Sequence, residues 1–164
     1  LAALTDKLTV EWTPPSDGPE RPCVRVLRAD GTDTGIAFHG VPGGHEFNSF
    51  VVGLYNAAGP GQSIDPALAE AIAAIDRPLD LQIVVALSCT MCPALVIAAQ
   101  KIAASNPLVT AKVYDVNHFP ELRERYKIMS VPCLIINKAK VAFGKKTLGQ
   151  LLELLAEPEA GQTG

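Results

Sequence analysis

The stretch from Leu81 to Ala104 constrains the fold more than any other part of the chain. It reads LQIVVALSCTMCPALVIAAQKIAA: an apolar run, then two cysteines three positions apart, then a helical pattern. A continuous apolar run of this length is typical of a strand that is buried on both faces of a parallel sheet. Because parallel strands are joined by crossover helices, we expect an α/β fold in which such a helix begins at the cysteines.

The rest of the second half continues this alternation and gives the order βαβαββα. The expected strands are Leu81–Leu87, Val109–Val116, Leu134–Asn137 and Lys140–Phe143. The expected helices are Cys92–Ala104, Pro120–Tyr126 and Thr147–Ala156.

The first half is expected to begin with strands. KLTVEW (7–12), PCVRVLRADG (22–31) and GIAFHG (35–40) have strand patterns separated by turn residues. A helix follows from Gly44, with Phe47, Phe50 and Leu54 among the residues at helical spacing. A second helix opens at Asp65, which we expect to be its N-cap.

An internal repeat relates the two halves. RPCVRVLRAD…GIAFHG resembles VPCLIINKAK…VAFGK: in each, Pro-Cys enters a strand, a turn follows, and Ile/Val-Ala-Phe precedes a helix. Duplication explains the shared Pro-Cys start better than chance, although chance similarity stays open. We therefore expect a degenerate unit at 1–62, which lacks its opening βα and the cysteine pair, a whole unit at 63–157, and a linker or tail at 158–164.

Composition argues against several partners. The net charge is −3, and no basic cluster exceeds Lys145 and Lys146, so we expect no nucleic acid partner. No apolar run approaches the roughly 20 residues of a membrane span, so we expect no membrane partner. Four cysteines are too few for a disulfide scaffold, which favours a reducing, cytoplasmic compartment. Because the chain opens with Leu1 and not Met, we expect that its N-terminus has been trimmed.

The cysteine pair has the spacing of a redox site. A helix N-terminus favours an anion and lowers a thiol pKa from about 8.5 toward neutrality, so Cys89 is expected to be the nucleophile. Cys92 lies one turn later and can resolve a mixed disulfide. One alternative is that the pair is half of a zinc site, but Cys23 and Cys133 do not form the second pair that such a site needs. A second alternative is that both cysteines are buried and inert. The residues between the pair include no histidine, so we expect a reducing potential.

A second signal is the sequence SVPC, from Ser130 to Cys133. A proline at the head of this strand is expected to be cis and to leave the backbone of the preceding residue free to pair with an extended substrate. The alternative is a trans proline on an edge strand. We expect the substrate-binding residues to be Val131, Pro132, Thr90 and Met91.

These features resemble the thioredoxin fold of the thioredoxin/glutaredoxin-like superfamily. With the degenerate copy and the motifs GHEF and LSCxxCP, the chain from Leu4 to Leu155 is similar to the N-terminal tandem thioredoxin-fold domain of the flavoprotein (F) subunit of bacterial alkyl hydroperoxide reductases. The resemblance implies that electrons pass by dithiol–disulfide exchange from an NADH-dependent flavoprotein to a peroxiredoxin disulfide. No Gly-x-Gly-x-x-Gly motif occurs, so FAD and NADH are expected beyond Gly164 or in a separate reductase.

The resemblance also implies a role for Glu46, the acid of GHEF. Thioredoxins carry a buried Asp six residues before the first cysteine, where this chain has Ile83. The resemblance therefore implies that Glu46 approaches the dithiol, with a pKa raised by burial, and acts as general base for Cys92. The alternative is a solvated glutamate at a helix N-terminus.

Cys133 departs from the pattern of the family. It either packs as a small buried hydrophobe or joins Cys89 and Cys92 in another disulfide or a soft-metal site. Cys23 has the same place in the degenerate copy, where core packing is expected. The three histidines are scattered, and no metal site is expected.

Two other functions use the same residues. One is a stand-alone glutaredoxin-like or protein disulfide oxidoreductase of broad substrate range. The other is a thioredoxin-fold module that binds a metal or a partner protein through its cysteines without turnover.

Overall fold

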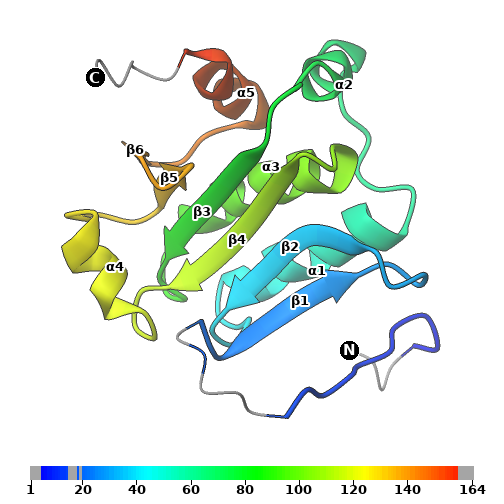
Figure 1. Cartoon of the computed structure of the whole chain (residues 1–164), viewed down its shortest axis with the longest axis horizontal. Coiled ribbons are helices and arrows are strands. Elements are labelled where there is room, and N and C mark those ends of the chain that lie inside the picture. Colours follow the sequence, from blue (N-terminus) through cyan, green and yellow to red (C-terminus); the bar gives the residue numbers. More distant parts are fainter. Residues whose placement is uncertain (1–4, 15–17, 19, 159–164) are drawn as a thin grey trace.

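The computed structural model describes residues 5–14, 18 and 20–158, and it contains one six-stranded mixed sheet in the order β1-β2-β4-β3-β5-β6 (Figure 1). The strands are Cys23–Leu27 (β1), Asp33–His39 (β2), Leu79–Val85 (β3), Val109–Asp115 (β4), Cys133–Ile136 (β5) and Lys140–Phe143 (β6). The helices are Glu46–Ala58 (α1), Pro66–Ala73 (α2), Cys92–Ser105 (α3), Pro120–Arg125 (α4) and Leu148–Ala156 (α5).

The centre of the sheet is parallel and its two ends are antiparallel. β4 pairs in parallel with both β2 and β3, whereas β1 pairs antiparallel to β2, β5 to β3, and β6 to β5. Because β2, β3 and β4 run in the same direction, their carboxyl ends meet at one edge of the sheet. The helices that follow β2 and β3, α1 and α3, therefore both begin at that edge.

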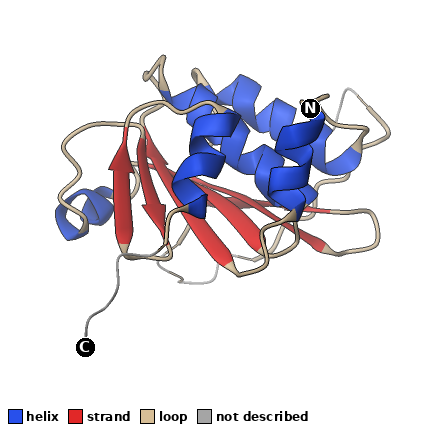
Figure 2. Ribbon diagram, turned by 90° about the horizontal axis from the view of Figure 1, so that it is seen from above, coloured by secondary structure: helices blue, strands red, loops and turns tan. Residues whose placement is uncertain are grey.

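Two hydrophobic cores lie on opposite faces of the sheet. Helices α1, α2, α3 and α5 cover one face, where the larger core includes Ile83 and Leu134 (Figure 2). Helix α4 covers part of the other face, where the smaller core includes the neighbouring residues Val84 and Cys133. This division follows from the alternation of side chains along a strand.

The α/β class and the order of the second half are confirmed, with element ends shifted by no more than two residues. Helix α2 begins as expected: the Asp65 side chain accepts a hydrogen bond of 2.8 Å from the Ala67 N–H. The tail expected at 158–164 lies outside the described residues apart from Pro158. None of the described helices has the length and apolar character that crossing a membrane requires.

The strand expected at 7–12 is wrong. These residues are described, but they form no strand, and Val10 and Trp12 are 57% and 91% exposed. The segment has the alternation of a strand, yet a strand also needs a hydrogen-bonded neighbour, and in the described part of the chain β1 pairs only with β2. Phe47, expected on the apolar face of α1, is 48% exposed.

The two copies of the repeat have matching local structure. β1–β2 and β5–β6 are both antiparallel hairpins followed by a helix. The Arg21–Pro22 and Val131–Pro132 peptide bonds are both cis. The carbonyl oxygen of Pro22 accepts a hydrogen bond of 2.7 Å from the Gly40 N–H, and that of Pro132 accepts one of 3.0 Å from the Gly144 N–H. The shared geometry favours duplication over chance similarity.

Candidate active site

The cysteine pair lies between the end of β3 and the start of α3. Cys89 and Cys92 are joined by a disulfide, with their Cα atoms 5.6 Å apart. The N–H of Cys89 donates a hydrogen bond of 2.9 Å to the Ala86 carbonyl oxygen, which closes the turn after β3. Cys92 is the first residue of α3, and Pro93 follows in the first turn, where its missing N–H needs no helical partner.

The two sulfurs differ in accessibility. Cys92 is fully buried in the larger core, whereas Cys89 is only half-buried. The residues between them, Thr90 and Met91, are exposed. An incoming thiol or disulfide can therefore reach Cys89, and Cys92 can act only from inside the protein.

The cis-proline loop lies beside Cys89. The Sγ of Cys89 is 3.9 Å from the carbonyl oxygen of Val131, the residue before Pro132. The expected cis bond is confirmed, and the alternative trans proline is wrong. Two residues before Val131, Met129 is 93% exposed, a feature that the sequence did not single out. Flexible, polarizable methionines are common on surfaces that adapt to partners.

Glu46 is the first residue of α1 and is fully buried. The Ser49 hydroxyl donates to its Oε2, while Oε1 has no hydrogen-bond partner among the described residues. Burial raises the pKa of Glu46 to about 7, and the Ser49 hydrogen bond opposes that rise. The alternative of a solvated glutamate is therefore wrong, while the role of Glu46 in proton transfer stays a prediction.

Backbone contacts hold the start of α1 against the approach to Cys89. The His45 N–H donates a hydrogen bond of 3.0 Å to the carbonyl oxygen of Leu87, two residues before Cys89. Gly44 has φ +53°, and a Cβ there would lie 2.3 Å from the same oxygen. Only glycine fits this position without strain, so the Gly-His-Glu sequence joins Glu46 to the redox loop.

Cys133 does not join the cysteine pair. It is fully buried in the smaller core, on the face of the sheet opposite the core that contains Cys92. Burial raises its pKa to about 11. A disulfide or metal site with Cys89 and Cys92 is therefore wrong, and the small-hydrophobe interpretation holds. Within the described ranges, no three His, Cys, Asp or Glu side chains gather as metal ligands.

The raised pKa of Glu46 makes stability depend on pH. Between its ordinary pKa of 4.5 and its folded value of about 7, the folded protein keeps a proton that the unfolded chain has lost, so the free energy of unfolding falls as pH rises. The Glu46→Gln variant has no ionisable group at this position, so its free energy of unfolding does not fall for this reason. Across that window, denaturant unfolding should show the variant gaining about 3 kcal/mol relative to wild type. Glu124→Gln, which removes an exposed carboxylate, is the control; equal pH slopes for wild type and Glu46→Gln would contradict the burial.

Comparisons with known proteins agree with this geometry. The family model described as "Thioredoxin domain" matches residues 79–156. The chain is 33% identical over 161 residues to the F subunit of alkyl hydroperoxide reductase of Pseudomonas aeruginosa, covering 98% of this chain but 30% of that protein. The chain thus spans about a third of the length of such curated relatives.

Two solved structures are similar. The F subunit of alkyl hydroperoxide reductase of Enterococcus faecalis has a TM-score of 0.80 and 43% identity, covering 84% of this chain and 65% of that one. A protein disulfide oxidoreductase from Aeropyrum pernix has a TM-score of 0.72 at 23% identity, covering 82% and 58%, and shows the fold alone. The chain belongs to the family of thioredoxin-fold domains that occur in the F subunit of alkyl hydroperoxide reductases.

Proposed function

We propose that this domain is a thiol–disulfide oxidoreductase that relays electrons from an NADH-dependent, FAD-containing reductase to the disulfide of a peroxiredoxin. The observation that carries the proposal is the disulfide of half-buried Cys89 with fully buried Cys92, beside the Val131 carbonyl of the cis-proline loop. In this arrangement a partner can reach the Cys89 sulfur, while the Cys92 sulfur is available to resolve the mixed disulfide from inside the protein.

In the reduced domain, the Cys89 thiolate attacks the partner disulfide. One partner sulfur leaves as a thiolate, and the other becomes joined to Cys89. Cys92 then attacks the Cys89 sulfur, the mixed disulfide breaks, and the second partner thiol is released. Two electrons have moved to the partner, and the domain holds the Cys89–Cys92 disulfide seen in the structure. The reductase restores the dithiol by the reverse exchange.

Cys92 must lose a proton to attack, and it has no access to solvent. We assign this proton to the Glu46 carboxylate, which begins α1 at the same sheet edge. A pKa of about 7 suits a group that takes and returns a proton near neutral pH. In this assignment Oε1, which has no partner among the described residues, is the atom free to take the proton.

The partner is proposed to bind as an extended segment along the cis-proline loop. The backbone of Val131 and Pro132 lies beside Cys89, which suits pairing with a strand that carries the partner cysteine. Exposed Thr90 and Met91 form the other side of this platform. These contacts depend on backbone and small or flexible side chains, so they fit peptides of varied sequence.

The reductase is proposed to be either fused beyond Gly164 or separate, since the curated relatives are about three times longer than this chain. FAD and NADH would bind there. We propose that the redox unit spans 63–157, that the silent unit spans 1–62, and that the exchange takes place in the cytoplasm, as the sparse cysteine content favours.

The relay is tested by NADH-dependent reduction of a peroxiredoxin disulfide, with this chain and a thioredoxin-reductase-like flavoprotein. We expect turnover that is lost in Cys89→Ser and retained in Cys133→Ala, because Cys133 lies on the opposite face of the sheet. Cys92→Ser should instead trap a mixed disulfide with the partner. No turnover with a Cys89–Cys92 pair that still titrates reversibly would favour a general disulfide oxidoreductase. Thiols that titrate only after chelation would favour metal binding.

The role of Glu46 is tested by single-turnover kinetics of the resolving step. If Glu46 takes the Cys92 proton, Glu46→Gln should slow resolution by about 100-fold above pH 7, the lower end of the usual effect of a general base. The wild-type rate should rise with pH up to the Glu46 pKa of about 7, and the variant should lose that inflection. Glu124→Gln is the matched control. Unchanged rates at every pH in Glu46→Gln would remove the assignment.

A further inference from the structure

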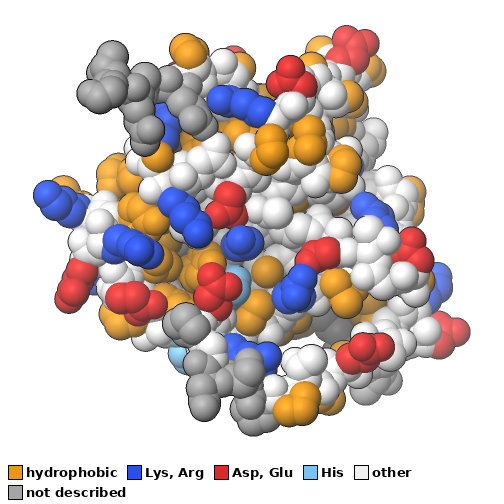
Figure 3. Space-filling view, viewed as in Figure 1, with side chains coloured by type: hydrophobic (Ala, Val, Ile, Leu, Met, Phe, Trp, Pro, Cys, Tyr) orange, Lys and Arg blue, Asp and Glu red, His pale blue; other side chains and the backbone are white. Residues whose placement is uncertain are grey.

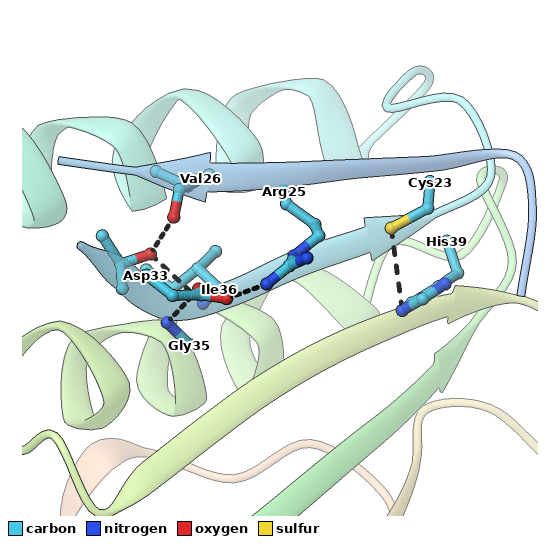
Figure 4. Close-up of polar contacts among 8 residues, drawn as sticks. Cys23, Arg25, Val26, Asp33, Gly35, Ile36 and His39 are labelled. Atoms are coloured by element: carbon cyan, nitrogen blue, oxygen red, sulfur yellow. Dashed lines mark hydrogen bonds and ion pairs between the residues drawn. The ribbon is translucent and has the colours of Figure 1, made fainter. Parts of the chain in front are cut away.

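A cysteine and a histidine face each other at one end of the β1–β2 hairpin (Figure 4). Cys23 begins β1, His39 ends β2, and the two are directly opposite in the antiparallel register, so their side chains lie on the same face of the sheet. The Sγ of Cys23 is 3.9 Å from Nε2 of His39. The disulfide Cys89–Cys92 belongs to the core on the opposite face.

Side-chain hydrogen bonds hold the two strands of this hairpin together at its other end. Asp33 accepts a hydrogen bond from Arg25 on the opposite strand and one of 2.9 Å from the Gly35 N–H. The Thr34 hydroxyl donates a hydrogen bond of 2.7 Å to the Val26 carbonyl oxygen. The register shifts between Arg25 and Leu27, and at the Cys23 end it is set by the backbone pairs Val24–Phe38 and Arg25–Ala37. The pairing of Cys23 with His39 therefore does not depend on the thiol contact itself.

The histidine ring is locked with its free nitrogen toward the thiol. Nδ1 is 2.7 Å from the carbonyl oxygen of Glu20, which can only accept, so Nδ1 carries the hydrogen. In the neutral ring, Nε2 then presents its lone pair to Cys23. The ring stacks on Tyr114 at 4.2 Å, meets the edge of Phe119, and is 3% exposed. Burial lowers the pKa of His39, which favours this neutral form.

Cys133 provides an internal comparison. It follows its cis-proline as Cys23 follows Pro22, and it has the same place in the repeat. Opposite Cys133 in the register, however, is Phe143, and the thiol is fully buried beneath the smaller core. Cys23 lies on the edge strand, is only half-buried, and has a base opposite. Only Cys23 therefore combines access with a proton acceptor.

Cys23 lies on the face of the sheet that is opposite the larger core. Helices α1 and α3 lie behind the sheet in Figure 1, on the face away from Cys23. In Figure 3 the same view shows charged side chains of both signs near the centre of this face and hydrophobic side chains to their left. A half-buried sulfur can be reached by a small reagent.

We propose that Cys23 and His39 form a second thiol site, independent of the relay, that exchanges with low-molecular-weight disulfides. His39 Nε2 takes the proton as Cys23 Sγ attacks one sulfur of the small disulfide; the disulfide bond breaks, a Cys23 mixed disulfide forms, and the leaving thiolate receives the proton from His39. One disulfide replaces another, so no further oxidant is needed. Burial raises the pKa of the Cys23 thiol, so attack near neutral pH needs this base.

The test uses the oxidised protein, in which Cys23 and Cys133 are the free thiols, with glutathione disulfide as the probe. Peptide mass spectrometry should find the mixed disulfide at Cys23 and not at Cys133. His39→Gln, which keeps a polar side chain without a base, should slow the reaction by at least about tenfold, because a general base contributes about 10²–10⁴. Thermal unfolding should verify that this variant is folded.

The pH profile separates a base from a merely structural residue. The wild-type rate should change little above the pKa of His39, because the base is then neutral and the thiol still protonated. His39→Gln should instead show a rate that rises tenfold per pH unit, as direct thiolate attack requires. Equal rates for Cys23 and Cys133, or identical pH profiles for wild type and His39→Gln, would overturn the proposal. A looser fold in His39→Gln would accelerate labelling, which is the opposite of the expected result.

Discussion

The parallel pairing of β2 with β4 is the interaction on which the rest of the structure depends. It joins the two halves of the chain in one sheet and aligns β2 with β3, on either side of β4. As a result, α1 and α3 start at the same edge, and Glu46 from the silent half is brought toward the cysteine pair of the active half. The carboxylate that we propose as the proton acceptor is therefore supplied by the first half of the chain, while Ile83 stands at the position six residues before Cys89.

Burial gives the site its chemical asymmetry. Cys92 and Glu46 are both withdrawn from water, whereas Cys89 keeps contact with solvent. Burial favours the uncharged form of Glu46 by raising its pKa to about 7. In the proposed relay, the proton that leaves Cys92 passes to the Glu46 carboxylate, so one buried negative charge replaces another. Cys133 is equally buried, but it packs among apolar side chains, and burial raises the pKa of its thiol to about 11.

The sequence predicted the parts of the site that depend on neighbouring residues. The apolar strand, the cysteine spacing and the proline at the head of β5 are local signals, and each led to the observed geometry. Long-range placement was harder. The alternation that puts Cys133 on the far face depends on strand register, and the contact of Cys23 with His39 depends on which residues are opposite in a hairpin. Residues 7–12 show the same difficulty. Their alternating pattern fits a strand, but the sequence pattern does not reveal whether a hydrogen-bonded neighbour is present.

Equilibrium titration against a dithiol redox buffer determines whether Cys89 and Cys92 form a reversible, reducing couple. Because Thr90 and Met91 place no histidine between the cysteines, the thiolate lacks the stabilisation found in strong oxidants. We expect one two-electron transition near −270 mV, about the value of thioredoxin. A midpoint near −120 mV, about that of a strong disulfide oxidant, or a pair that cannot be reduced and reoxidised, would contradict it.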